Sequence, residues 1–200
     1  MATIKFQFDP NKVVQSAALL LKRHGKPMSY LGLLKMLYIA DRRSLECSDQ
    51  PITGDRYVAM EYGPVLSGVY DLIKDKEIGV RGAQSLWAEY IERCPNPEKP
   101  KAKKDYALHL LQDPGDDDLC DQDVAILEEV YQEFGSLDPF KVVDWTHDLP
   151  EWEDPREKKL KVTDIYVDTL LELLGRSPEE IEEIYQDTIR ERYLDEVLSG

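Results

Sequence analysis

Residues 31–43 read LGLLKMLYIADRR, an apolar run that ends abruptly in three charged residues. Ser29 stands just before this run, where serine is preferred as an N-cap, and the pattern predicts a helix that continues to about Cys47. Apolar side chains occupy nearly every position from Leu31 to Ala40. A helix that is apolar almost all round is normally buried. This segment is therefore predicted to lie at the centre of a helical core.

Further helices are predicted on both sides of this buried segment. Residues 11–24 carry apolar side chains at helical spacing, and Gly25 stops this helix. The last helix begins at Ser177-Pro178, where a capping residue and a proline at the first helical position precede two glutamates. This last helix covers residues 178–198. The other predicted helices cover residues 64 to about 74, 124–134, 138 to about 147 and 163–174, and Gly135 ends the helix over 124–134.

Three short segments are rich in strand-forming residues: 56–62, 86–93 and 105–111. Gly63-Pro64 is predicted to form a strand-to-helix corner, because glycine tolerates unusual φ and proline suits the first helical position. The connector over residues 95–104 is predicted to be a mobile, exposed loop.

Helical patterns dominate the rest of the chain, so we expect a mainly α fold. It combines a helical bundle with a small antiparallel β-sheet (α+β, α-rich) and has extra C-terminal helices. Residues 1–152 are expected to form one domain. Residues 153–200 are expected to add an acidic helical extension packed on that domain.

The charge of the chain is concentrated in its second half. Residues 1–100 hold 14 Lys and Arg against 12 Asp and Glu, a net charge of +2, whereas residues 101–200 hold 11 against 28, a net charge of −17. A negative field of this size repels nucleic-acid phosphates and anionic lipids and attracts basic protein surfaces. The alternative is that the acidic residues serve solubility alone, and the sequence leaves both interpretations open.

Cys47, Cys94 and Cys120 are odd in number, far apart and outside any C-x-x-C pair, so neither a disulfide framework nor a zinc site is expected. Residues 1–9 lack the apolar core of a signal peptide, and no stretch approaches the roughly 20 apolar residues that span a bilayer. We therefore expect a cytoplasmic protein with no membrane partner, no metal and no cofactor.

Few residues suggest catalysis. The glycines of residues 63–68 have the spacing of a phosphate loop, but Val69-Tyr70 follow where lysine and a hydroxyl residue are required. His147-Asp148 near Trp152 is the one constellation that fits an enzyme. A helix-capping histidine beside a core tryptophan is the preferred explanation. Direct nucleic-acid binding is not expected, because the acidic chain has no long basic stripe.

Four stretches together resemble the Panacea domain family, which includes SocA-like antitoxins and phage-associated proteins. The similarity covers about residues 12–152, and its specific part is 35–72. One departure is Leu66, where the family often has a second proline. The stretches are LKMLYIADR at 34–42, PITGDRYVAM at 51–60, YGPV at 62–65 and THDLPEW at 146–152, and residues 121–135 resemble the family's next acidic helix.

The resemblance implies an antitoxin that neutralises a co-encoded protein toxin by direct binding, without catalysis. Several toxins of such systems block translation, and an RNA-binding toxin would offer a basic surface to the acidic half of this chain. Some members resemble adaptors that deliver the toxin to a ClpXP-type protease. An enzyme built on His147 and nearby carboxylates, and a transcription regulator, are further alternatives. The candidate toxin-binding residues within these motifs are Asp55, Arg56, Tyr57, Tyr62, Gly63, Pro64, His147 and Trp152.

Overall fold

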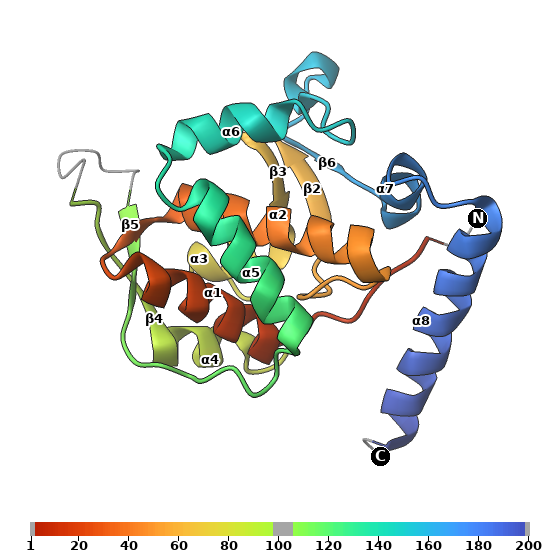
Figure 1. Ribbon diagram of the computed structural model, residues 1–200, viewed down its shortest axis with the longest axis horizontal. Coiled ribbons are helices and arrows are strands. Elements are labelled where there is room, and N and C mark those ends of the chain that lie inside the picture. Colours follow the sequence, from red (N-terminus) through yellow and green to blue (C-terminus); the bar gives the residue numbers. More distant parts are fainter. Residues whose placement is uncertain (1–2, 98–105, 199–200) are drawn as a thin grey trace.

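A long buried helix, α2, lies at the centre of the computed structural model, which describes residues 3–97 and 106–198. Figure 1 shows α2 behind α5, with α1 below and α6 above, and α2 contacts all three. The elements run in the order α1 (Pro10–His24), β1 (Met28–Ser29), α2 (Tyr30–Ser48), β2 (Tyr57–Met60), β3 (Gly63–Leu66), α3 (Ser67–Ile73), α4 (Ala83–Tyr90), β4 (Ile91–Pro95), β5 (Tyr106–Leu110), α5 (Asp121–Phe134), α6 (Pro139–His147), a 3-10 turn (Pro155–Lys158), β6 (Val162–Asp164), α7 (Val167–Leu173) and α8 (Pro178–Leu198).

The predicted central helix is confirmed, and local signals explain its neighbours. Ser29 is the N-cap residue of α2, although its side chain makes no capping hydrogen bond. In α1 the Asp9 carboxylate accepts hydrogen bonds from the first backbone amides, and Gly25 ends the helix at φ 69°. The helices predicted over 124–134, 138–147 and 178–198 are also confirmed.

The mainly α fold class is confirmed, but the strands form two antiparallel sheets rather than one. One sheet has the order β1-β5-β4 and the other β3-β2-β6, each with three strands. The first lies beside α1, and the second carries a hairpin whose β3 strand packs on α2 and α6. The two sheets therefore cover different parts of the helical core.

Three local predictions are wrong. Gly63-Pro64 begins β3, and helix α3 starts only at Ser67. Proline is tolerated there because β3 is an edge strand, where a missing amide leaves no ladder bond unmade. Most of residues 86–93 belong to helix α4, whose Trp87 is buried in the core.

The start of the helix predicted over 163–174 is also different, because β6 pairs with β2 and α7 follows at Val167. The strand predicted over 105–111 is confirmed as β5. The predicted connector lies largely outside the described residues, and within them Pro95 ends β4 and Asn96 is buried.

The buried apolar cluster is continuous from Ile4 to Ile184 and includes Ile165, Leu170 and Leu171 of the C-terminal region. Residues after 153 therefore contribute to the same core as α2. None of the helices in the described part of the chain is long and apolar enough to cross a membrane.

Candidate functional site

The central helix α2 carries polar side chains that have no access to solvent. Lys35, Tyr38 and Asp41 are all fully buried. A buried polar group is destabilising unless it is hydrogen-bonded, so each of these side chains needs a partner inside the protein. The partners come from the three other segments that the sequence analysis singled out.

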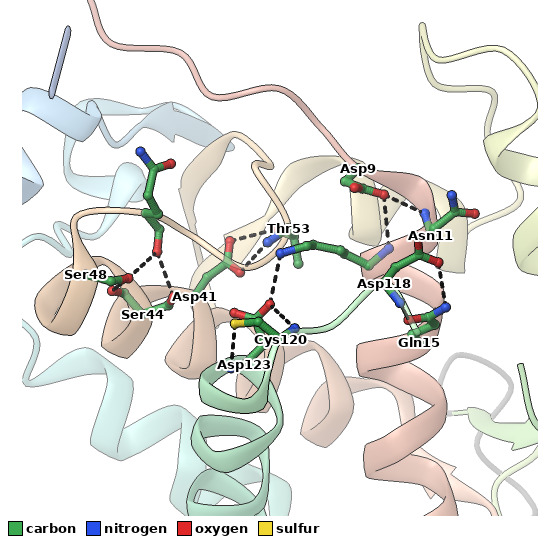
Figure 2. Close-up of polar contacts among 12 residues, drawn as sticks. Asp9, Asn11, Gln15, Asp41, Ser44, Ser48, Thr53, Asp118, Cys120 and Asp123 are labelled. Atoms are coloured by element: carbon green, nitrogen blue, oxygen red, sulfur yellow. Dashed lines mark hydrogen bonds and ion pairs between the residues drawn. The ribbon is translucent and has the colours of Figure 1, made fainter. Parts of the chain in front are cut away.

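Asp41 connects α2 to the segment before the hairpin. Its carboxylate accepts hydrogen bonds from the Thr53 amide (2.9 Å), the Thr53 hydroxyl (2.6 Å) and the Tyr57 hydroxyl (3.2 Å). Figure 2 shows Asp41 of α2 facing Thr53 in the loop that follows the helix. Burial raises the pKa of Asp41 to about 7, although the hydrogen bonds lower this pKa because they favour the ionised form. The loop from Thr53 to Tyr57 is thus fixed on α2.

Glu151 connects the 146–152 segment to the same helix. One carboxylate oxygen, Oε1, accepts hydrogen bonds from the Tyr38 hydroxyl (2.9 Å) and from Arg42 Nε (2.7 Å). The Glu151 side chain is fully buried, while Arg42 is partly exposed. Oε2 is buried and has no hydrogen-bond partner among the described residues. The ion pair positions the chain that follows α6.

Lys35 connects α2 to the hairpin of β2 and β3. Its ammonium group Nζ donates a hydrogen bond to the Pro64 carbonyl oxygen at 2.7 Å. Burial lowers the pKa of Lys35 to about 7, because the charged form loses its hydration. The hairpin therefore covers the end of a buried amine.

Gly63 allows the hairpin to approach this closely. Its φ of 90° is in the region that side chains rarely adopt, and it follows the two-residue turn between β2 and β3. A Cβ atom at this position would stand 2.6 Å from Thr146 Oγ1 and 2.8 Å from Lys35 Nζ. Glycine is thus required both for the turn and for the contact between β3, α2 and α6.

His147 and Trp152 close the same region. Their rings stack at a centroid distance of 3.8 Å with 8° between the planes, and Trp152 Nε1 donates to the Met60 carbonyl at 3.1 Å. His147 Nε2 is buried without a hydrogen-bond partner among the described residues. Burial is the main reason why the pKa of His147 is lowered, and the positive charge of Lys35 lowers it further. A neutral, stacked imidazole fits a packing role for this pair.

The structure brings together five of the eight predicted site residues. Gly63 and Pro64 are buried, His147 and Trp152 are half-buried, and Tyr62 at the turn is exposed. The Tyr62 ring is 50% exposed and packs edge to face against Phe140 of α6, which is 46% exposed, at 6.2 Å. Sequence reasoning missed Phe140, because its exposure depends on how α6 is rotated. This aromatic pair is the solvent-facing part of the site.

The other three predicted residues lie at the far end of the hairpin. The Asp55 carboxylate accepts hydrogen bonds from the Gly68 and Val69 amides at 2.9 Å each, which caps α3. Tyr57 is buried against Asp41. Arg56 is exposed, donates to the Ser67 hydroxyl and lies 3.5 Å from Asp164. These three residues border a cleft of about 660 Å³ that is separate from the Tyr62–Phe140 pair.

A second cleft, of about 650 Å³, reaches the start of α6. Met28, Met36, Phe134, Leu137 and Pro139 are among the residues that line it. Pro139 directly precedes Phe140 in the sequence, but neither Phe140 nor Tyr62 lines this cleft. The cleft and the exposed aromatic pair are therefore separate features at the start of α6.

Comparison with known families gives one match. The family model described as "Antitoxin SocA-like, Panacea domain" matches residues 33–153, more than half of the chain. Searches of curated proteins and of solved structures gave no significant match. The matched region begins in α2 and ends after Glu151, and it contains every partner of Lys35, Tyr38 and Asp41 described above.

Gly63→Ala should destabilise the protein by about 1–3 kcal/mol, since it combines strain at positive φ with a clash against Thr146 and Lys35. Urea unfolding of the purified variant measures this change. Gly79→Ala is the matched control, because φ is not positive at Gly79 and nothing lies within 4 Å of its added Cβ. Equal stability of the two variants would show that the hairpin does not depend on Gly63.

Lys35 should make stability depend on pH above neutrality. Below pH 7 the amine binds a proton in both the folded and unfolded states, whereas between about 7 and 10.5 the unfolded state binds the proton more tightly. The free energy of unfolding of the wild type should therefore rise across this window relative to Lys35→Met. The limit is about 1.4 kcal/mol for each unit that separates the two pKa values. Urea titrations at several pH values measure it, and parallel pH profiles would contradict a buried, titrating Lys35.

Proposed function

Because this chain belongs to the SocA-like antitoxin family with the Panacea domain, we propose that it neutralises a co-encoded protein toxin by binding it directly. The family match over residues 33–153 is the observation that carries this proposal. A toxin that blocks translation and presents a basic surface suits the charge of −17 in residues 101–200. The complex would form in the cytoplasm, and Panacea-like residues 1–152 would carry the acidic extension 153–200 packed on them.

The proposed contact centre is Tyr62 with Phe140, at the tip of the hairpin and on α6. Both rings are about half exposed, and aromatic residues dominate the energetics of protein interfaces. Gly63, Pro64 and Trp152, whose Nε1 donates to the Met60 carbonyl, would hold the hairpin that carries Tyr62 in position. Asp144 and Asp148 are exposed on the same helical segment and would favour a basic partner.

Sequestration is preferred over catalysis for a geometric reason. A histidine that acts as a general base needs a polar partner to orient it and access to a substrate. His147 stacks on Trp152, and no carboxylate in the described part of the chain is hydrogen-bonded to it. Delivery of the toxin to a ClpXP-type protease is the alternative within the same family, and it differs in the fate of the toxin.

Co-expression tests the proposal directly. The adjacent small reading frame should arrest growth when expressed alone and be harmless when expressed together with this chain, because the complex blocks the toxin. Growth curves, with co-purification of both chains, measure the outcome. Growth arrest that co-expression leaves unchanged would refute the antitoxin function, and rapid loss of the toxin in protease-proficient cells alone would favour the adaptor.

Tyr62→Ala combined with Phe140→Ala should weaken toxin binding by about tenfold or more, since truncating central aromatic residues removes most of the contact energy. The melting temperature should change little, because both rings are half exposed. Tyr166→Ala and Leu160→Ala are matched controls, as both side chains are equally exposed elsewhere on the surface. Undiminished binding by the double variant would move the contact away from α6.

His147→Ala should leave neutralisation largely intact if the variant folds.

A further inference from the structure

The C-terminal half of α8 exposes a row of apolar side chains. Tyr193 is 65% exposed and Val197 is 58% exposed, and Ile189, Leu194 and Leu198 are also exposed. In Figure 1, α8 forms one edge of the molecule, and its C-terminal end is the end farther from the other elements. An exposed helix in a folded domain normally turns polar residues to solvent. This half of α8 turns apolar residues to solvent as well as the polar Arg190, Glu191 and Arg192.

The exposed apolar row is not the side by which α8 packs. The helix is held by Ile184 and Thr188, which are 8% and 5% exposed. Tyr193 follows Ile184 by nine residues and Val197 follows Thr188 by nine, which is about two and a half turns of an α-helix. Tyr193 and Val197 therefore point away from the face that contacts the protein.

A hydrogen bond from a side chain of α8 to the N-terminal segment supports this orientation. Arg192 Nη2 donates a hydrogen bond to the Lys5 carbonyl oxygen at 2.9 Å, from a position between the two faces of the helix. The apolar row is thus presented to solvent by a helix that is attached at Ile184, Thr188 and Arg192. Contiguous exposed apolar side chains of this kind mark interaction sites.

Charge decides between the possible occupants of this face. Residues 178–198 contain eight acidic residues and two arginines, a net charge of −6, and the part before the apolar row, residues 178–188, holds five of the acidic residues and neither arginine. A second copy of the chain that docked along the whole helix would bring another −6 to the contact, and like charges repel across an interface. A cationic partner would gain attraction from the same residues.

We propose that the outward face of α8, formed by Ile189, Tyr193, Leu194 and Val197, docks a cationic amphipathic segment of a partner protein. The apolar row takes the partner's apolar side chains, and the acidic residues of α8 pair with its basic ones. Ile189, Tyr193 and Val197 are spaced four residues apart, so they form one stripe on the helix along which the apolar side of a second amphipathic helix can pack. The identity of the natural partner, the toxin, rests on the proposed function, whereas the chemistry of the face does not.

The probe is a fluorescent synthetic helix made of leucine and lysine, and its counterpart has glutamate in place of lysine. The full chain should bind the lysine peptide and not the glutamate peptide in an anisotropy titration at low salt. Tyr193→Ser combined with Val197→Ser should weaken binding by about tenfold or more. Leu111→Ser combined with Leu160→Ser is the matched control and should bind normally, because these residues are exposed elsewhere on the surface, after β5 and after the 3-10 turn.

A second variant tests the contribution of charge without altering the apolar row. Replacing Glu179, Glu182 and Glu183 by Lys should slow association of the lysine peptide by about tenfold. Raising the salt concentration from about 50 to about 500 mM should have the same effect on the wild type. Far-UV circular dichroism confirms that α8 is still formed in each variant.

Three results would overturn the proposal: equal binding of both peptides, unchanged binding by the Tyr193 and Val197 variant, or self-association of the wild type that this variant abolishes. The last result would assign the face to a second copy. A wild-type chain that binds the lysine peptide through α8 but fails to protect cells from the toxin would refute the proposed function alone. The expected result is charge-selective binding that is lost with the apolar row.

Discussion

The burial of α2 is the constraint on which the rest of the structure depends. The first half of this helix is almost wholly apolar, yet the helix contains a lysine, a tyrosine and an aspartate with no access to water. Removing such groups from water without a partner would cost several kcal/mol each. Thr53, Pro64 and Glu151 supply the partners, so two consecutive segments and a third one far downstream are fixed on one helix. All these contacts lie within the region that the family model matches.

This arrangement separates the residues that hold the site from those that face a partner. Asp41, Lys35 and Glu151 are buried and act on the hairpin and on the end of α6. Tyr62 and Phe140 stand on the resulting surface, half exposed and packed against each other. A substitution in the first group would change binding through the fold, and one in the second group would change it through contact. Both groups fall within the region that the family model matches, so the match alone does not distinguish them.

The sequence predicts most helices well because their signals are local. The apolar run of α2, the Gly25 stop of α1 and the Asp138-Pro139 start of α6 all lie within or next to the elements they define. One error falls where pairing is distant: β6 forms because Val162–Asp164 meets β2, about a hundred residues earlier. Trp87 favours a strand by propensity, yet its burial in the core is satisfied in helix α4. Five of the eight candidate residues meet at the hairpin tip, but no sequence pattern indicated that Phe140 would join them.

The central claim is that the buried polar residues of the motifs serve the fold and do not contact the toxin. Calorimetric titration of the toxin into Glu151→Gln, well below its melting temperature, tests this most directly. Glu151 is fully buried and bonded to Tyr38 and Arg42, so the account predicts a lower melting temperature with an unchanged Kd for the folded variant. An unchanged melting temperature with a clearly weakened Kd would contradict it.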